Sequence, residues 1–288
     1  MQTVVIRFSS LGDIVLCGFV TGQLEPVTFV TSPRYRELAQ VLPGVTKVIC
    51  PPEDPLPKKA SKIIDLHANP RSNWTAAKIK GPVKTVKRYD FLRRMRVAFK
   101  WQKKPPLVVQ RYAAAADVDV DLRPWLHTEG EKEQLVLCPF AQHATKCWPA
   151  ENYVSLARQW DGRVLLLGGI TERKQLRKMV DQIGTKASYI AEQGFVKTLA
   201  ALGNGKIAVG GDTGLMHLCA VSGMPVVMLF GPTTSTDGFW CHQGVVVEQQ
   251  MFCRPCARHG GPRCPIGDHL CLRSITVSAV QKAIGEML

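Results

Sequence analysis

Short apolar runs separated by amphipathic segments are the main pattern along this chain. In its first part, strand-like runs with helical segments between them occupy residues 3–8, 26–31, 46–50 and 62–66. The same alternation resumes at Gln134 and continues to the apolar run Val226–Phe230. Strands that alternate with helices form parallel sheets covered by helices. The pattern therefore predicts an α/β protein with parallel sheets.

A region without a clear period separates the two series of strands. It covers residues 105–133 and ends in a polar run, residues 127–133, where we place a linker. The chain has 288 residues, of which 45% are hydrophobic, and this suffices for two packed cores. We expect one domain at residues 1–130 and a second at residues 131–288, whose final helix (274–288) returns toward the first.

The segment Val209–Pro232 predicts a binding site for an anion. Its glycine-rich turn joins a strand to an apolar helix, and Asp212 and Thr213 are favourable residues for the start of that helix. Unpaired N–H groups and the positive end of the helix dipole, as at Thr213 and Gly214, favour phosphate. A diphosphate ligand is one interpretation, and an ordinary capped helix between two strands is the other.

Three further segments place polar residues after strand-like runs. The N-terminus, Thr3–Val15, has the strand, loop and helix that open a Rossmann-like domain, but it lacks the G-x-G-x-x-G fingerprint of a nicotinamide site. Lys146 stands in a K-x-W-P element, and Glu172 ends a G-G-x-x-E element. By themselves, these two residues are also compatible with an exposed lysine and with an acid that favours the first turn of a helix.

Together these motifs resemble those of the bacterial ADP-heptose:lipopolysaccharide heptosyltransferases. The matching elements are R-x-S-S-L-G-D at Arg7–Asp13, K-x-W-P at Lys146–Pro149, G-G-x-x-E ending at Glu172, and D-T-G-x-x-H at Asp212–His217 before F-G-P. The resemblance implies the GT-B architecture, in which two Rossmann-like domains with parallel sheets face each other across a cleft. The chain departs from the family before Lys146, where the threonine-rich phosphate loop of some members is missing.

The resemblance also implies roles for single residues. Asp13 would be the catalytic base, whereas by its position alone it caps the first helix. The donor-binding residues that the resemblance implies are Lys146, Glu172, Asp212, Thr213, Gly214 and His217. Without the resemblance, His217 on an apolar helix is a core residue. No Asp-x-Asp motif stands at a strand end, so the sequence requires no cofactor.

The predicted enzyme is an inverting glycosyltransferase that moves a heptose from ADP-heptose to the inner core of lipopolysaccharide. The acceptor that the resemblance implies is a membrane-embedded lipid A core whose Kdo sugars bear carboxylates. Two alternatives remain open. Another GT-B enzyme, such as a nucleotide-sugar epimerase, would act on the donor without an acceptor. A non-catalytic, basic RNA-binding protein would show steep salt dependence, whereas the transferase is expected to bind no nucleic acid.

The formal net charge of +14 is concentrated in one segment. Residues 78–104 hold eleven Lys and Arg residues and one acidic residue, with aromatic residues between them. Such a segment suits a phosphorylated or carboxylated acceptor, the anionic cytoplasmic leaflet or nucleic acid. A solvated helix face is the simpler alternative. We expect Arg93, Arg94 and Arg96 to contact the acceptor.

The sequence also indicates where in the cell the protein is located. It contains no apolar run of eighteen uncharged residues, and its N-terminus opens directly as a strand rather than as a leader peptide. We therefore expect a cytoplasmic protein that contacts the cytoplasmic leaflet of the inner membrane peripherally.

Ten cysteines are many for a cytosolic enzyme. Four of them, spaced C-x2-C-x7-C-x6-C, suit a four-thiolate structural zinc site: Cys253, Cys256, Cys264 and Cys271. Reduced thiols without a metal are the alternative, whereas structural disulfides are not expected in the reducing cytosol.

Overall fold

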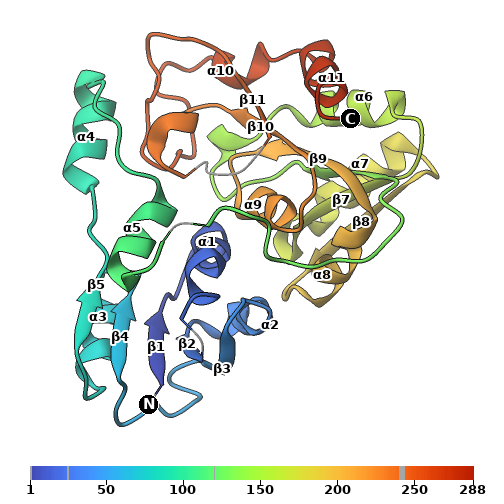
Figure 1. Ribbon diagram of the computed structural model, residues 1–288. Helices are drawn as coiled ribbons and strands as arrows, with labels where there is room; N and C mark the ends of the chain where they lie inside the picture. Colours follow the sequence, from blue (N-terminus) through green and yellow to red (C-terminus); the bar gives the residue numbers. More distant parts are fainter. Residues whose placement is uncertain (1, 25, 120, 240–243) are drawn as a thin grey trace. The chain divides into compact units, whose positions relative to one another are not determined.

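The computed structural model describes residues 2–24, 26–119, 121–239 and 244–288 (Figure 1). The chain divides into two compact units. Unit 1 consists of Met1–Tyr89, Pro106–Leu126 and Gly194–Val196, and unit 2 consists of Asp90–Pro105, His127–Gln193 and Lys197–Leu288. The basic segment found in the sequence is therefore divided, and its second half, Asp90–Pro105, belongs to unit 2.

Unit 1 is built around a parallel five-stranded sheet with the strand order β3-β2-β1-β4-β5. Its strands are β1 (Thr3–Ile6), β2 (Val27–Val30), β3 (Val45–Ile49), β4 (Lys62–Asp65) and β5 (Val83–Thr85). The first four confirm the predicted strands, whereas β5 consists of exposed residues and gives no apolar signal. The helices are α1 (Leu11–Thr21), α2 (Arg36–Gln40), α3 (Pro70–Ala77) and α5 (Val108–Ala116), with the short 3-10 helix η1 (Pro33–Tyr35).

Helix α1 lies in the core of unit 1, as its sequence requires. Its residues Ile14–Thr21 are all buried, so the helix has no polar face along this stretch. Gly18 allows the ring of Trp125 to approach, because a Cβ at this position would lie 2.3 Å from the ring. Helix α5 also packs against α1 and so brings a distant part of the chain to its side.

Unit 2 contains a parallel six-stranded sheet with the strand order β11-β10-β9-β6-β7-β8. Its strands are β6 (Gln134–Cys138), β7 (Val164–Gly169), β8 (Ala187–Glu192), β9 (Gly205–Gly211), β10 (Val226–Phe230) and β11 (Val245–Glu248). The α-helices are α4 (Asp90–Phe99), α6 (Ala150–Gln159), α7 (Arg173–Ile183), α8 (Val196–Ala201), α9 (Gly214–Val221), α10 (Leu270–Arg273) and α11 (Val277–Gly285). The 3-10 helices are η2 (Ala144–Lys146), η3 (Ile170–Glu172), η4 (Leu202–Asn204) and η5 (Ser235–Asp237). The two parallel sheets with their helices confirm the predicted α/β class.

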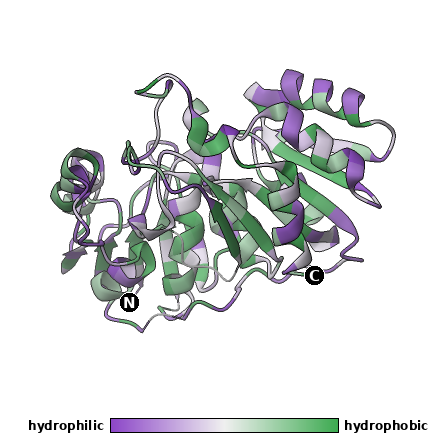
Figure 2. Cartoon of the chain, turned by 90° about the horizontal axis from the view of Figure 1, so that it is seen from above, coloured by the Kyte–Doolittle hydropathy of each residue, from purple (hydrophilic) through white to green (hydrophobic). Residues whose placement is uncertain are grey.

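The core of unit 2 connects the K-x-W-P element to the end of the chain. Trp148 is buried, packs edge to face on Tyr153 with 4.9 Å between the ring centroids, and donates from Nε1 to the carbonyl oxygen of Ile275 at 2.9 Å. Ile275 precedes α11, which packs on α6, β10 and β11. The strands in the middle of Figure 2 have the colour of hydrophobic residues, whereas outer helices carry hydrophilic stretches. The expected return of the final helix to the first domain stays a prediction.

In each sheet, the order of the strands reverses beside the strand that comes first in the chain. In unit 1, β1 lies between β2 and β4, and in unit 2, β6 lies between β7 and β9. The chain therefore builds one half of each sheet outward and then returns to build the other half. In open parallel sheets, ligands bind outside the carboxyl ends of the strands at such a switch point. The loops after β1 and β4, and those after β6 and β9, are thus the places to search for a site.

Candidate active site

The switch point of unit 1 holds Asp13 in a network of polar groups. Asp13 is the third residue of α1, and its Oδ2 lies 2.6 Å from a guanidinium nitrogen of Arg7. The same oxygen accepts hydrogen bonds from the Ser10 hydroxyl at 2.7 Å and the Ser10 backbone N–H at 3.2 Å. Oδ1 accepts a hydrogen bond from the hydroxyl of Tyr112 on α5 at 3.1 Å. Asp13 thus helps to cap α1 and also carries an oriented, largely buried carboxylate.

This network fixes the protonation state of Asp13. Burial raises the pKa of the carboxyl group, but the Arg7 guanidinium and the hydrogen bonds from Ser10 and Tyr112 lower it by more. The resulting pKa is about 2, compared with the usual 3.8. Asp13 is therefore an anion at neutral pH, and Arg7 and Tyr112 hold it in one orientation.

His67 lies beside this network in the loop after β4. Its Nδ1 accepts a hydrogen bond from the backbone N–H of Phe8 at 3.1 Å. Burial, followed by the charge of Arg7, lowers the pKa of His67 to about 4. The imidazole is therefore neutral at pH 7, and its proton is on Nε2, which makes it a hydrogen-bond donor rather than a base.

Asp65, at the end of β4, supports this loop. Its Oδ1 accepts hydrogen bonds from the backbone N–H groups of His67 at 2.8 Å and Ala68 at 3.0 Å, and its Oδ2 accepts one from the Ser72 hydroxyl at 2.7 Å. The carboxylate is fully buried and saturated by these bonds. Asp65 thus shapes the loop that carries His67.

The switch point of unit 2 holds an ion pair between Lys146 and Asp212. Lys146 ends η2 in the loop after β6, Asp212 follows β9, and Nζ lies 2.5 Å from Oδ2. Both side chains are largely buried, so Lys146 is not the exposed lysine that the sequence also allowed. Thr233 donates a hydrogen bond to the same carboxylate oxygen at 3.0 Å. Gly211 permits the approach of the two loops, because a Cβ there would lie 2.3 Å from the Lys146 carbonyl oxygen.

The start of α9 is the second part of this site. Thr213 is the N-cap residue, but its side chain makes no capping hydrogen bond. Its Oγ1 is buried and has no hydrogen-bond partner within the described part of the chain. The first N–H groups of α9, from Gly214 on, have no partner inside the helix. A buried hydroxyl and free helix donors at the positive end of a dipole suit an anionic ligand.

His217 and Glu172 complete the predicted donor set. His217 is buried on α9. Burial raises the pKa of the Asp212 carboxyl group, but the nearby Lys146 and His217 lower it by more. Glu172 ends η3 after β7 and accepts a hydrogen bond from the backbone N–H of Gly169 at 2.5 Å. The predicted donor residues therefore follow three adjacent strands, β9, β6 and β7, at their carboxyl ends.

The structure adds residues that the sequence did not single out. Tyr112 reaches Asp13 from α5, and Thr233 reaches Asp212 from the loop after β10. No local pattern marks Tyr112, because its contact depends on how α5 packs against α1. The sequence could have indicated Thr233, since this residue directly follows the F-G-P that ends a predicted strand.

The three arginines predicted to contact the acceptor lie on α4 in different surroundings. Arg93 and Arg96 are buried, and Arg94 is exposed. Arg96 forms an ion pair with Asp237, 3.1 Å between Nε and Oδ1, and Arg93 donates to the carbonyl oxygen of Arg258. Two of the three side chains are therefore engaged within unit 2, and their contact with an acceptor stays a prediction.

The four cysteines of the C-terminal region share one cavity. Cys253, Cys256, Cys264 and Cys271 line a space of about 20 Å³. Burial raises the pKa of Cys256 and raises that of Cys271 to about 11, so these two thiols are protonated at neutral pH. Among the residues that the structure describes, no three His, Cys, Asp or Glu side chains are arranged to hold a metal ion.

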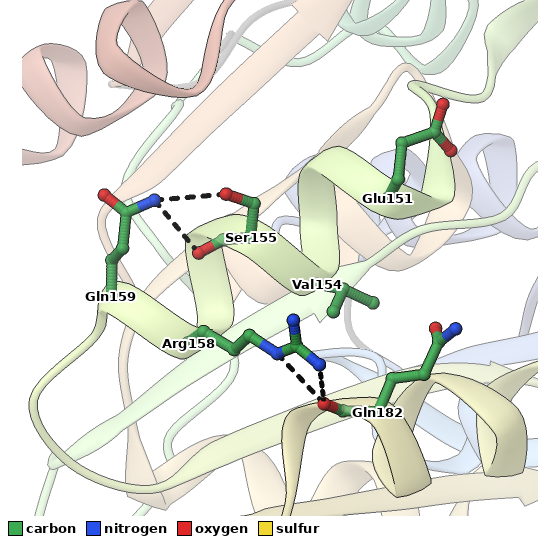
Figure 3. Close-up of a pocket in the computed structure, with 6 residues that line it drawn as sticks. All are labelled: Glu151, Val154, Ser155, Arg158, Gln159 and Gln182. Atoms are coloured by element: carbon green, nitrogen blue, oxygen red, sulfur yellow. Dashed lines mark hydrogen bonds between the residues drawn. The ribbon is translucent and has the colours of Figure 1, made fainter.

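A larger surface pocket of about 450 Å³ lies between α6 and α7 (Figure 3). Its polar groups bind one another: Arg158 donates to the carbonyl oxygen of Gln182, and Gln159 donates to Ser155. The pocket contains none of the predicted site residues, so its size alone does not make it the active site.

Comparisons with known proteins show the family of the chain. The family model for glycosyltransferase family 9 (heptosyltransferase) matches residues 74–262. Lipooligosaccharide heptosyltransferase 2 of Campylobacter jejuni subsp. jejuni serotype O:2 is 26% identical over 167 residues, which are 54% of this chain and 51% of that protein. The chain thus spans about half the length of the curated relatives it matches.

Two solved structures share the fold over nearly the whole chain. A glycosyl transferase family 9 protein from Veillonella parvula DSM 2008 has a TM-score of 0.75 at 18% identity, covering 99% of this chain and 96% of that one. The ADP-heptose lps heptosyltransferase II of E. coli has a TM-score of 0.71 at 18% identity, covering 100% and 98%. These likenesses support the GT-B fold.

The Asp13 network predicts a specific dependence of stability on pH. Because the folded pKa of Asp13 is depressed, its contribution is present above the unfolded pKa near 3.8 and is lost as pH falls toward 2. The wild type should therefore lose about 2 kcal/mol of its stability advantage over Asp13→Asn as pH falls across this range. Urea unfolding between pH 5 and pH 2 measures the difference. Asp161→Asn, at an exposed carboxylate, is the control. If the difference in free energy of unfolding between the wild type and Asp13→Asn does not change with pH, the assignment is contradicted.

Proposed function

The chain belongs to glycosyltransferase family 9, and we propose that it transfers a heptose from ADP-heptose to the inner core of lipopolysaccharide, with inversion at the anomeric carbon. One observation carries the proposal: the loops after β6 and β9 place Lys146, the Thr213 hydroxyl and the start of α9 at the switch point of unit 2. Family membership favours transfer over the two alternatives, an epimerase and an RNA-binding protein.

The proposed donor site binds the leaving group. As the bond between the sugar and the diphosphate breaks, negative charge accumulates on the phosphate oxygens. Lys146 and the N–H groups of Thr213 and Gly214 stabilise this charge, and the Thr213 hydroxyl donates a hydrogen bond to it. The ion pair with Asp212 holds the lysine in place before the donor binds. Glu172 accepts hydrogen bonds from the nucleoside, and His217 packs beside the donor.

The proposed acceptor step uses Asp13. The acceptor hydroxyl forms a bond to the anomeric carbon as the bond to the diphosphate breaks, and its proton passes to the Asp13 carboxylate. A carboxylate with a pKa of about 2 is a weak base toward an alcohol. It therefore accepts the proton late, when the new bond has made the hydroxyl acidic. Arg7 and Tyr112 keep the carboxylate oriented, and His67 donates a hydrogen bond from Nε2 to an oxygen of the acceptor.

The proposed acceptor is the lipid A core with its Kdo sugars, which lies in a membrane. Within the described residues, no helix combines the length and the apolar character needed to cross a bilayer. From the family resemblance, we propose that the protein is cytoplasmic and contacts the cytoplasmic leaflet of the inner membrane peripherally. Contact of Arg94 with an acceptor carboxylate is part of this proposal, because its side chain is exposed.

An assay with ADP-heptose and truncated lipopolysaccharide acceptors tests the function. We expect acceptors to gain one heptose by mass spectrometry as ADP is released, and calorimetry to show preference for ADP over UDP and GDP. Lys146→Met should weaken ADP binding by about tenfold or more, because a charge-assisted contact to phosphate is lost. Lys282→Met, an exposed lysine of the same unit, is the control. Unchanged ADP affinity in Lys146→Met would remove this residue from the site, and ADP binding without transfer to any acceptor would contradict the function.

A structural zinc site at the four cysteines is the second part of the proposal. The donor set of four soft thiolates fits zinc, and the cysteines already surround one cavity, although their side chains are not arranged as a coordination shell. Zinc bound there would replace the thiol protons and hold the loop between β11 and α10.

Elemental analysis tests the zinc site. Purified protein should contain about one equivalent of zinc, and chelation should lower its melting temperature. Cys264→Ser should lose the metal, and Cys50→Ser, at a buried cysteine of unit 1, should keep it. Protein that is free of metal and has an unchanged melting temperature would leave reduced thiols as the better account.

A further inference from the structure

Helix α4 presents its aromatic residues to solvent and buries two of its three arginines. Arg93 and Arg96 are 6% and 5% exposed, whereas Phe91 and Phe99 are each 72% exposed. A surface helix of a water-soluble domain shows the opposite distribution, with apolar residues inside and charges outside. The outward face of α4 is therefore unusual and requires an explanation.

Specific contacts fix this orientation of α4. Arg96 pairs with the buried Asp237 and donates a second hydrogen bond to the Thr236 hydroxyl at 3.1 Å. Arg93 donates to the carbonyl oxygen of Arg258 and stacks over the ring of Phe239, 4.8 Å from its centroid. Rotating the helix to hide its aromatic residues would break a buried ion pair and expose these polar contacts. Unit 2 thus holds the aromatic face outward.

The outward face continues beyond the helix. Trp101, two residues after α4, is 48% exposed. Lys100 donates hydrogen bonds to the carbonyl oxygens of Cys253 at 2.7 Å and Pro255 at 2.8 Å, so the end of α4 lies against that loop. Phe252 of the same loop is 84% exposed. Exposed aromatic residues on two adjacent segments form a patch rather than the scattered single residues of an ordinary surface.

The charges around this patch are positive. Positions i, i+3, i+7 and i+8 share one helix face, which places Arg94 between Phe91 and Phe99. Lys103 and Lys104 follow and are exposed, and residues 91–104 contain no acidic residue. Phenylalanine and tryptophan ringed by basic residues are typical of surfaces that enter the headgroup region of anionic membranes.

The partly buried neighbours decide between a membrane and a nucleic acid. Leu92, Met95 and Val97 of α4 are half-buried, so part of each aliphatic side chain remains exposed on the same helix. These aliphatic side chains have no group that can bond to a base edge, but they suit acyl chains. A phospholipid bilayer therefore matches this surface better than RNA does.

We propose that α4 and the loop that carries Phe252 form a docking surface for an anionic phospholipid bilayer. Phe91, Phe99, Trp101 and Phe252 enter the headgroup region, while Lys103 and Lys104 contact lipid phosphates. The inference rests on the proposed function in one respect, since a membrane-embedded acceptor gives the enzyme a reason to dock. It adds the surface, and it assigns Arg93 and Arg96 to positioning α4.

Sedimentation with vesicles tests the surface without donor or acceptor. The probes are vesicles of phosphatidylcholine alone and of phosphatidylcholine with about one third phosphatidylglycerol. Wild-type protein should bind the anionic vesicles at least about tenfold more tightly, because basic residues contribute only there. The combined Phe91→Ser, Phe99→Ser, Trp101→Ser and Phe252→Ser variant should lose at least about tenfold in affinity for anionic vesicles. Lys103→Gln with Lys104→Gln should lose most of the preference for anionic lipid.

Matched controls separate docking from folding and from catalysis. Trp74→Ser, at an exposed tryptophan of α3 in unit 1, should bind vesicles like the wild type. ADP affinity and melting temperature should be unchanged in every variant, because all substituted side chains are exposed. Wild-type vesicle binding by the fourfold variant, or an equal loss in Trp74→Ser, would overturn the proposal. Vesicle binding by a protein that transfers no heptose would leave the docking surface in place and contradict only the proposed function.

Discussion

The ion pair between Lys146 and Asp212 is the contact on which the proposed donor site of unit 2 depends. It joins two loops that are 66 residues apart in the chain and follow neighbouring strands. Both groups are largely removed from water, where a single unpaired charge would be costly, so each requires the other. Gly211 makes the contact sterically feasible, and Thr233 satisfies part of the carboxylate. The pair leaves the Thr213 hydroxyl and the start of α9 as the open donors of the site.

Unit 1 also contains a largely buried ion pair, but there the anion has the proposed chemical role. Arg7 and Asp13 form this pair at a switch point, and the Asp13 carboxylate is the group that would react. This orientation comes with a low pKa, about 2, so in the proposed mechanism Asp13 accepts a proton only from a hydroxyl that is already becoming acidic. Burial and the charge of Arg7 keep His67 neutral, and the N–H of Phe8 occupies its Nδ1, so in the proposed mechanism it binds the acceptor without competing for its proton.

The sequence predicted the parallel α/β class, most of the strands though not β5, and the loops that carry Lys146, Glu172 and Asp212, because apolar periodicity and glycine-rich turns are local signals. It did not predict Tyr112, whose contact with Asp13 spans 99 residues. It expected all three arginines of α4 to contact the acceptor and gave no sign that Arg93 and Arg96 are buried within unit 2. Three arginines lie between the two phenylalanines of this helix, and the partner that fixes its buried face, Asp237, lies 141 residues away from Arg96 in the sequence.

The central claim is that Asp13 accepts the acceptor proton, and single-turnover kinetics of Asp13→Asn test it most directly. Asparagine keeps the size and the capping position but cannot take the proton, so the rate of transfer should fall by about 10² to 10⁴ with ADP affinity little changed. Titration with ADP counts the folded sites, which keeps a loss of stability from being mistaken for a loss of chemistry. Transfer by Asp13→Asn at a rate near that of the wild type would contradict the account.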